Sequence, residues 1–399
     1  MKKLLILGAS VLQVPAIRKA REMGLYTAVA DYDPRAVGIP LADRYYNVST
    51  IDEQGVWQAA ADLGADGIMT LATDMPMRAA AYACGRLGLP GISYETAVRA
   101  TDKGEMIRAF EAAGVAHPQY VILPDPARAD PAVLERIVYP CITKPTDNSG
   151  SRGVMLVQSR DELAQALAYS SANGRKGGVI VEEYMRGPEV SVEIVVYRGT
   201  VHVLQVTDKL TTGAPHFVEM GHSQPSRLSA PQLAAVRALA VQAVRAVGIV
   251  DGAAHVEIMV TRDGPKMVEL GARLGGDCIT THLVPLSTGV DMVRAVIDIA
   301  LGRVPAVEPG RRQGSAIRFF DVPCGRIRGI AGAEQARQIP GVREITFTKA
   351  AGDPVGEIGS STDRVGFVIA QGEDAAAAVA ACEQAVRTVR IDVEKPAGV

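Results

Sequence analysis

Hydrophobic and polar positions alternate through the first hundred residues in blocks of two kinds. KKLLILGA, YTAVADYD and GIMTLATD are short apolar runs that predict buried strands. VPAIRKAREMG and MPMRAAAYACGRLG carry apolar residues at helical spacing and predict amphipathic helices. Strands that alternate with helices indicate a parallel sheet covered on both faces. Residues 1–100 are therefore predicted to form an α/β domain.

The pattern changes after residue 100. Residues 117–186 contain the short strands YVILP and YPCITKP, the loop DNSGSRGV, a helix and the strand GGVIVEEYM, which together predict a small α+β unit. Long alternating runs between 188 and about 300 predict antiparallel strands, with helices at PQLAAVRALAVQAVRAVG and VDMVRAVIDIALG. A segment rich in Pro, Gly and Arg then leads to short strands and the alanine-rich helix EDAAAAVAACEQAVRTV.

Length and charge limit the classes of function. With 399 residues the chain exceeds one typical domain, so two or three structural units are expected. The formal net charge of -2 gives no electrostatic reason to expect a nucleic acid or a membrane surface as partner. The first apolar run is too short for a leader peptide, and the absence of an apolar stretch of ~20 residues argues against a membrane span.

The cysteines give information about the compartment. They number five, are scattered along the chain and form no CxxC pair. This pattern argues against a disulfide framework and against a structural zinc site. A reducing cytoplasm is the expected location.

A candidate phosphate-binding loop follows Lys144. Its residues are Asn148, Ser149, Gly150, Ser151, Arg152 and Gly153. Glycines allow backbone N–H groups to converge on phosphate oxygens, and hydroxyl and guanidinium groups add donors. The sequence is not GxxxxGK[ST], which excludes the common nucleotide loop. A polar hairpin turn is the alternative interpretation.

Two carboxylates occupy later strands. Glu257 in HVEIMV and Glu269 in MVELGARLGG both have apolar neighbours, so each must be solvated, paired or bound to a metal. Magnesium prefers carboxylate oxygens together with nucleotide phosphates, and two acids on adjacent strands could provide them. Arg273 lies near this pair and could hold a carboxylate or a developing oxyanion. The alternatives are acids that face water and a surface salt bridge.

The ordered set of Lys103, Lys144, the glycine loop, VEEYMRGPE, HVEIMV and VELGARLGG resembles the ATP-grasp superfamily. The resemblance covers nearly the whole chain, including the segment DRVGFVIAQGEDAAAAV, which is similar to the end of biotin carboxylase. It implies a mixed α/β and α+β fold in three parts. These are a Rossmann-like domain at 1–100, an ATP-grasp domain at 101–305 with a lid subdomain at 117–186, and a C-terminal subdomain at 306–399 that completes the core.

The resemblance implies ATP with Mg²⁺ or Mn²⁺ as cofactors. Lys103 and Lys144 would contact the phosphates, and the glycine loop would close over them. Glu257 and Glu269 would bridge magnesium to the β- and γ-phosphates. Many family members have an asparagine two residues after the second glutamate as a third metal ligand, whereas this chain has Gly271.

The adenine hinge implied by the resemblance runs from Glu182 to Met185. Backbone groups of Glu183 and Met185 would bind the base, and Glu189 would bind the ribose hydroxyls.

Two further segments, TTGAPHFVEMGHSQPS and ELGARLGGDCITTHLVPLSTGVD, resemble carboxylate–amine ligases that include the bacterial L-amino acid ligases. In that subgroup Glu219 would receive the substrate ammonium and His222 would lie beside the acyl centre. Arg273 would hold the carboxylate that is activated, and Asp277 would border the acceptor pocket. For His222 a structural loop histidine is the alternative.

The expected function is an ATP-dependent ligase that forms an amide bond, of the dipeptide type, through an acyl phosphate and releases ADP and phosphate. The expected partners are a small-molecule carboxylate, such as an amino acid, and an amine acceptor. Related enzymes are often dimers, but the sequence carries no interface signature, so the oligomeric state stays open between a homodimer and other assemblies.

Other functions remain open at this stage. A purine-pathway ligase or formyltransferase would need basic residues for a phosphorylated ribosyl substrate, and Arg311, Arg312 and Arg318 could provide them. A regulatory nucleotide-binding protein without catalysis is an alternative of another class. A nicotinamide enzyme is disfavoured because LGASVLQVP lacks the GxGxxG motif.

Overall fold

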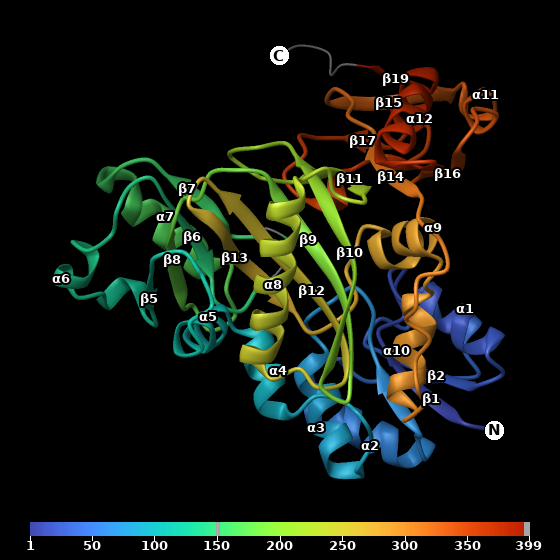
Figure 1. Cartoon of the computed structure of the whole chain (residues 1–399), viewed down its shortest axis with the longest axis horizontal. Coiled ribbons are helices and arrows are strands. Elements are labelled where there is room, and N and C mark those ends of the chain that lie inside the picture. Colours follow the sequence, from blue (N-terminus) through green and yellow to red (C-terminus); the bar gives the residue numbers. More distant parts are fainter. Residues whose placement is uncertain (149, 151, 395–399) are drawn as a thin grey trace.

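The computed structural model describes residues 1–148, 150 and 152–394. The first part of the chain forms a four-stranded parallel sheet in the order β3-β2-β1-β4. Figure 1 labels two of its strands, β1 and β2, beside α1. Its strands are β1 (Lys3–Leu7), β2 (Tyr26–Asp31), β3 (Arg44–Asn47) and β4 (Gly67–Met69). The helices beside it are α1 (Val14–Glu22), η1 (Ile39–Leu41), α2 (Glu53–Leu63) and α3 (Met77–Leu87).

The parallel sheet is covered on both faces, as its apolar strands predict. Leu4 and Ile6 pack towards α1 and α10 (Met292–Ala300), while Leu5 and Leu7 pack towards α2 and α3, because alternate residues of a strand point to opposite faces. Helix α10 therefore comes from a segment far along the chain from the sheet that it covers. The order of the sequence alone does not predict this partner, since sequence periodicity shows an apolar face without its destination.

A second, antiparallel sheet has the order β5-β8-β6-β7 and forms the lobe at the left of Figure 1. We call it the lid sheet. Two helices, α4 (Tyr94–Thr101) and α5 (Lys103–Ala112), precede it. Its elements are β5 (Tyr120–Leu123), η2 (Pro126–Arg128), α6 (Pro131–Leu134), β6 (Cys141–Pro145), β7 (Met155–Val157), α7 (Arg160–Ala172) and β8 (Val179–Glu183).

The largest sheet has eight strands in the order β13-β12-β9-β10-β11-β14-β18-β16, all paired antiparallel. Its strands are β9 (Glu189–Tyr197), β10 (Thr200–Thr211), β11 (Glu219–Gln224), β12 (Gly252–Thr261), β13 (Gly264–Gly271), β14 (Gly314–Phe319), β16 (Val342–Phe347) and β18 (Gly366–Gly372). Helix α8 (Ala230–Val247) packs on its first half, and α12 (Ala375–Thr388) packs on β14 and β18. Residues on both sides of position 305 thus contribute to one sheet.

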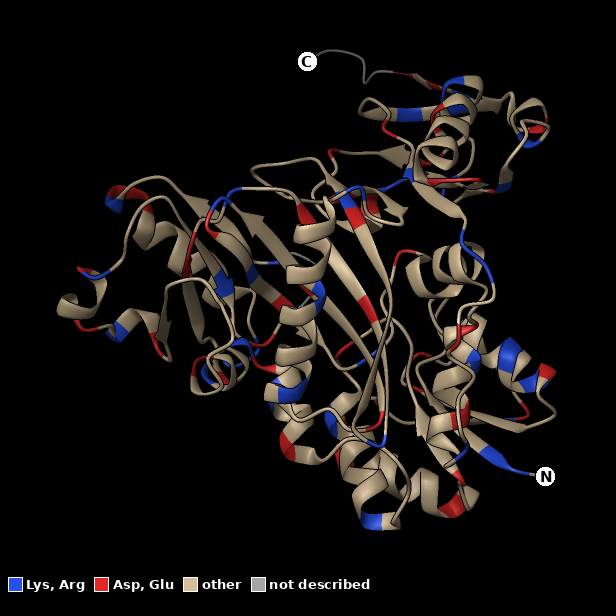
Figure 2. Cartoon of the chain, in the orientation of Figure 1, with Lys and Arg blue, Asp and Glu red and all other residues tan. Residues whose placement is uncertain are grey.

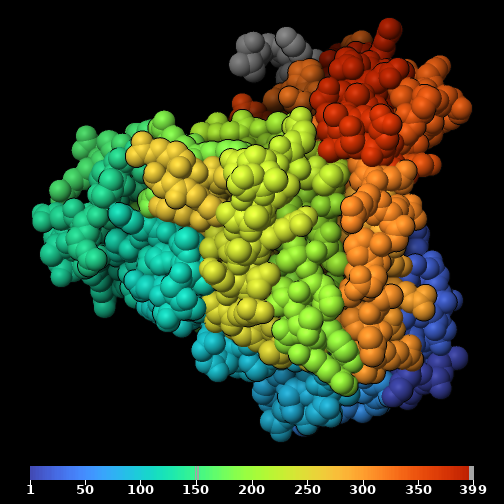
Figure 3. Space-filling model, viewed as in Figure 1, coloured from blue at the N-terminus to red at the C-terminus, as the bar shows by residue number. Residues whose placement is uncertain are grey.

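The remaining elements connect these layers. They are η3 (Ile279–Leu283), a π-helix, with α9 (Val284–Thr288), η4 (Ser361–Asp363), α11 (Ala333–Arg337) and a small sheet of β15 (Gly325–Ala331), β17 (Pro354–Val355) and β19 (Arg390–Glu394). Figure 2 shows Lys and Arg interspersed with Asp and Glu along the ribbon. Figure 3 shows the N-terminal, central and C-terminal segments packed against one another. Among the described residues, no helix has the length and apolar character that crossing a membrane requires.

Candidate active site

Two acidic side chains face each other across neighbouring strands of the large sheet. Glu257 on β12 pairs directly with Glu269 on β13, and Ser191 on β9 pairs with Glu257 from the other side. His255 on β12 pairs with Gly271 on β13, two residues along each strand from the glutamates. Residues two apart in a strand share a face, so His255 and Gly271 lie on the same side of the sheet as Glu257 and Glu269. The strand pairing therefore brings together the two acids predicted to bind metal.

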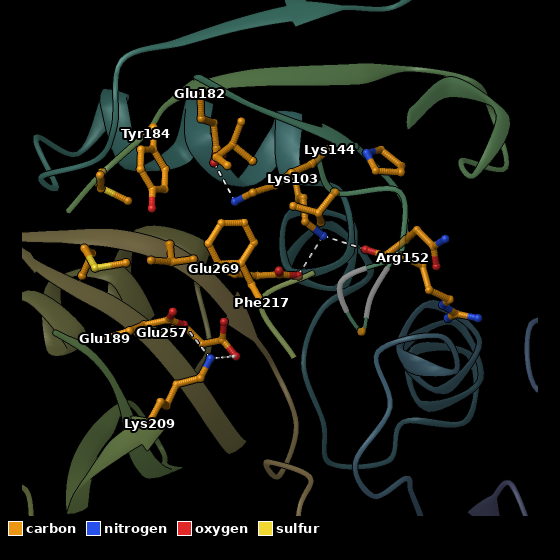
Figure 4. A pocket seen from close by; sticks show the side chains of 18 of the residues that line it. Lys103, Lys144, Arg152, Glu182, Tyr184, Glu189, Lys209, Phe217, Glu257 and Glu269 are labelled. Carbon is orange, nitrogen blue, oxygen red and sulfur yellow. Dashed lines mark hydrogen bonds and ion pairs between the residues drawn. The ribbon is translucent and has the colours of Figure 1, made fainter. Parts of the chain in front are cut away.

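The glutamates lie in a cleft between the lid sheet and the large sheet (Figure 4). The cleft is open to solvent and is lined by both charged and apolar side chains. Its charged lining side chains are Lys103, Lys144, Arg152, Glu182, Glu183, Glu189, Lys209, Glu219, Glu257 and Glu269. Apolar lining residues are Ile142, Val154, Met185, Phe217, Met259 and Val268, and Tyr184 lies with them. The cleft thus has a charged end and an apolar end, as an ionised ligand with a flat base requires.

The two predicted phosphate-binding lysines enter this cleft. Lys144 on β6 donates from Nζ to Glu182 Oε2 over 2.6 Å, with both side chains buried. Burial alone would lower the pKa of Lys144, but the carboxylates of Glu182 and Glu269 raise it, so the lysine stays charged. Lys103 is the first residue of α5, and its Nζ donates to Glu269 Oε1 over 2.9 Å and to the carbonyl of Asn148 over 2.6 Å.

The glycine loop lies over the same cleft. Gly150 and Arg152 line it, and Gly150 has a positive φ of 68°. Gly153 packs closely, because a Cβ there would lie 2.7 Å from Pro145 and from Asn173. Ser149 and Ser151, which were also predicted to contact phosphate, lie outside the described residues.

The predicted adenine hinge follows the lid sheet. Glu183 at the end of β8 accepts from the Gln119 backbone over 2.9 Å and from Lys266 over 2.7 Å, so its side chain ties the lid sheet to β13. Met185 is buried and lines the apolar end of the cleft. The chain then turns at Gly187, where φ is 151° and a Cβ would lie 2.0 Å from the carbonyl oxygen of Val260. Only glycine fits this approach of the hinge to β12.

Lys209 on β10 is a central residue that the sequence motifs did not reveal. Its side chain is only 4% exposed, and its Nζ lies 2.5 Å from Glu189, 3.3 Å from Glu257 and 3.5 Å from Glu219. Burial would lower the pKa of Lys209, yet the three carboxylates raise it well above the ordinary value. The lysine therefore neutralises a site rich in acids. No local pattern indicated it, because position 209 shares a strand face with the polar Gln205 and Thr207 and not with the apolar Leu204 and Val206.

His255 contacts Glu257 and is itself paired with the buried carboxylate of Glu193. His255 Nδ1 lies 3.0 Å from Glu193 Oε2, and its Nε2 lies 3.3 Å from Glu257 Oε1. Burial alone would lower the pKa of His255, but the Glu193 carboxylate raises it to about 9. A charged histidine between two carboxylates fixes the orientation of Glu257. Neither residue was singled out in the sequence, because both sit in strands that read as apolar core.

A second cavity continues from the charged end of the cleft. Lys209, Glu219, Glu257 and Glu269 line both spaces. His222, Arg273 and Asp277, which were predicted to form the substrate site, line this second cavity with Asp74 and Gly271. The structure therefore brings the predicted nucleotide and substrate residues to adjoining spaces.

Long-range ion pairs hold the substrate-site residues. His222 Nε2 lies 3.2 Å from Asp277 Oδ2, and Arg364 donates to both oxygens of Asp277 over 2.8 and 2.6 Å. Arg273 donates from Nη2 to Asp74 Oδ2 over 2.9 Å. Asp74 and Arg364 were missed by sequence reasoning, since they come from the N-terminal and C-terminal parts of the chain and carry no local motif.

The residues fit a magnesium ion shared with phosphate. No three His, Cys, Asp or Glu side chains within the described part of the chain are preassembled around one point. The pair of Glu257 and Glu269 nevertheless suits Mg²⁺, which takes one or two carboxylates and completes its shell with phosphate oxygens and water.

Two family models match the chain. Residues 137–281 match the ATP-grasp domain, and residues 318–394 match the L-amino acid ligase C-terminal domain 2. The solved L-amino acid ligase of Bacillus licheniformis has a TM-score of 0.85 at 22% identity, covering 99% of each chain. Phosphoribosylglycinamide synthetase of Anaerococcus prevotii has a TM-score of 0.80 at 22% identity, covering 98% of this chain and all of that one. At these identities the structures show the shared fold.

Relatives of known name are similar over most of the chain. Carnosine synthase 1 of Mus musculus is 26% identical, over 77% of this chain and 40% of its own length. Alanine–anticapsin ligase of Bacillus subtilis (strain 168) is 27% identical, over 73% of this chain and 66% of its own length. The chain thus spans less than two thirds of either relative. Formate-dependent phosphoribosylglycinamide formyltransferase of Sulfurisphaera tokodaii is 26% identical, over 87% of this chain and 88% of its own.

The match over residues 137–281 and the solved structures show that the chain contains an ATP-grasp domain and has an ATP-grasp fold. The same chain contains, after its ATP-grasp domain, a segment that matches the C-terminal domain 2 of the L-amino acid ligases. The predicted ATP-grasp fold and the predicted cofactors of the family, ATP and Mg²⁺, are thereby confirmed.

Proposed function

We propose that this protein is an ATP-dependent carboxylate–amine ligase that activates an amino acid as an acyl phosphate and joins it to an amine, forming a dipeptide-type bond. The observation that carries the proposal is the junction of the two cavities at Glu257, Glu269 and Lys209. A γ-phosphate held at that junction is open to a carboxylate that comes from the second cavity. The L-amino acid ligase C-terminal domain supports an amino acid as substrate.

The nucleotide is held by groups of different character at the two ends of the cleft. Phe217, Met259 and their apolar neighbours enclose the adenine, and backbone groups of the hinge at Glu183 and Met185 bind its polar edge. Glu189 binds the ribose. Lys103 and Lys144 bind phosphate oxygens under the glycine loop, while Glu257 and Glu269 hold magnesium, which supplies charge neutralisation at the transferring phosphoryl group.

The substrate is held by complementary charges in the second cavity. Arg273 binds the carboxylate, and Glu219 receives the ammonium group. His222 lies beside the acyl centre, with its orientation fixed by Asp277. One anionic and one cationic side chain in the same cavity match the charges of a zwitterionic amino acid.

The chemistry follows from this placement. A carboxylate oxygen of the substrate attacks the γ-phosphorus, the bond from that phosphorus to the β–γ bridging oxygen breaks, and ADP leaves. The lid sheet and the glycine loop exclude water, which would hydrolyse the acyl phosphate. The amine then attacks the acyl carbon, Arg273 stabilises the oxyanion, the nitrogen releases one proton, and phosphate leaves with the oxygen that came from the carboxylate.

A second candidate is a ligase or formyltransferase that acts on a phosphorylated ribosyl amine. The similarity to the formyltransferase over 88% of its length favours it. Among the arginines considered for this role, Arg318 donates to the backbone carbonyl of His222 over 3.1 Å. It therefore contacts the main chain of a predicted substrate residue.

Phosphate release tests the proposal and separates the candidates. The protein is incubated with ATP and Mg²⁺ and the twenty amino acids, singly and in pairs, and products are identified by mass spectrometry. Phosphate release that depends on particular pairs, with a matching dipeptide mass, supports the proposed function. Release only with a phosphoribosylamine and formate or an amino acid would replace it by the second candidate. Binding of ATP without turnover in either panel would favour a regulatory protein.

A further inference from the structure

Gly271 marks a place on β13 where a side chain is missing and another residue fills the space. It follows Glu269 by two residues and therefore faces the same side of the sheet. A Cβ at this position would lie 2.6 Å from Asp74 Oδ1 and 2.9 Å from Arg273 Cζ. Any side chain at position 271 would collide with the Asp74 carboxylate. The absence of a side chain at Gly271 therefore leaves the space that the Asp74 carboxylate occupies.

Asp74 reaches this position from the loop between β4 and α3, in the N-terminal part of the chain. Its Oδ2 accepts from Arg273, whereas Oδ1 is buried and has no hydrogen-bond partner among the described residues. Asp74 and Glu269 line the same two cavities. A buried carboxylate oxygen without a partner is costly unless a cation or a donor meets it. The unpaired oxygen therefore indicates a ligand.

We infer that Asp74 supplies a third protein oxygen to the metal site of Glu257 and Glu269, in place of the side chain that Gly271 lacks. This inference rests on the proposed function, because it takes the two glutamates as magnesium ligands. A carboxylate oxygen has the chemistry that Mg²⁺ prefers. The site is then built from two parts of the chain, and the N-terminal part contributes directly to metal binding.

The charges around the site agree with this assignment. Each of the three carboxylates is paired with a cation of the chain: Glu257 with Lys209, Glu269 with Lys103 and Asp74 with Arg273. A divalent cation competes with these side chains for the same oxygens. Three negative charges gathered without such compensation would repel one another strongly.

Manganese binding in the presence of ADP tests the inference without relying on turnover. Free Mn²⁺ is measured by electron paramagnetic resonance with the wild type and with D74A, G271N, D74A/G271N and E269Q. Loss of Asp74 is expected to weaken Mn²⁺ binding by about tenfold or more. G271N alone is expected to weaken it too, because the new side chain meets Asp74. The double variant is expected to regain most of the affinity, since the Arg273 side chain, released from Asp74, can move away from position 271 and the asparagine provides an oxygen.

The swap distinguishes a metal ligand from a residue that only positions Arg273. A double variant as weak as D74A would overturn the inference, because the introduced asparagine then fails to replace the oxygen that Asp74 supplied. Unchanged Mn²⁺ binding in D74A would also overturn it. If E269Q binds Mn²⁺ as the wild type does, the assignment of Glu269 as a metal ligand is wrong. The proposed function then fails independently of the role of Asp74. D74N replaces D74A if that variant does not fold: its amide oxygen stays on Arg273, its NH2 group then faces the site and cannot bind a metal, and a loss of affinity is expected.

Discussion

Glu257 and Glu269 face each other on β12 and β13, and each is held by a lysine from elsewhere in the chain. Lys209 Nζ lies 3.3 Å from Glu257, and Lys103 Nζ lies 2.9 Å from Glu269. Four charges, two of each sign, are thereby concentrated near the junction of the two cavities, which are proposed to hold the nucleotide and the substrate. The account of catalysis depends on this arrangement.

Replacement of Glu269 by Gln tests the arrangement. The amide has the size of the carboxylate but lacks its charge, so a magnesium ion at this site loses a negatively charged ligand. We expect ATP-dependent turnover to fall by about 100-fold or more. Glu95→Gln, an exposed acid on α4, is the matched control and should retain activity. Turnover at the wild-type rate in Glu269→Gln would show that Glu269 does not bind the metal.

The buried pair of Lys144 and Glu182 makes a second prediction. Lys144→Met leaves a buried carboxylate without its cation, which should lower the free energy of unfolding by about 3–5 kcal/mol. The double variant Lys144→Met/Glu182→Gln should recover most of that stability, because no charge remains buried. Its affinity for ATP should stay low, since Lys144 is the proposed phosphate ligand. Denaturant unfolding and calorimetric titration with ATP measure the two effects, and a double variant that binds ATP normally would exclude Lys144 from phosphate binding.

The hinge glycine gives a third prediction. Gly187→Ala should destabilise the protein and weaken ATP binding, because its Cβ would collide with the carbonyl of Val260. Gly199→Ala is the matched control, since Gly199 also has a positive φ but has open space where a Cβ would lie. The control should lose only about 1–3 kcal/mol, the usual cost of backbone strain. Equal melting temperatures for the two variants would contradict the steric account.

Much of the site was predictable because its elements carry local patterns. The alternation around Glu257 and Glu269, the glycine loop and the hinge motif are all contiguous segments, and the strand pairing brings them to one cleft. Lys209, Asp74 and Arg364 were not predicted. Each acts through a partner far away in sequence, and periodicity shows which face a residue occupies but not what that face meets. The same reason hid the packing of α10 on the N-terminal sheet.

Asp277 makes the folded state sensitive to acid. Burial alone would raise the pKa of Asp277, but bonds from Arg364 and His222 lower it below its ordinary value of 3.8. The folded protein then binds this proton less tightly than the unfolded chain. The pair therefore stabilises the fold above pH 3.8, and this contribution is lost as the pH falls below that value.

The pH dependence is measured by comparing Asp277→Asn with the wild type. The difference between their unfolding free energies should shrink as the pH falls below 3.8, by at most about 1.4 kcal/mol per pH unit. Asp392→Asn, an exposed acid on β19, should show no comparable convergence. A difference that is constant with pH would mean that Asp277 titrates normally in the folded protein.

The most direct test of the acyl-phosphate account follows one oxygen atom. Once a productive pair of substrates is known, the activated amino acid is labelled with ¹⁸O in its carboxylate, and the products are analysed by mass spectrometry. The account predicts one ¹⁸O atom in each phosphate released with an amide bond, because the carboxylate oxygen that attacks the γ-phosphate leaves with it. Unlabelled phosphate, or label found in AMP, would contradict the mechanism.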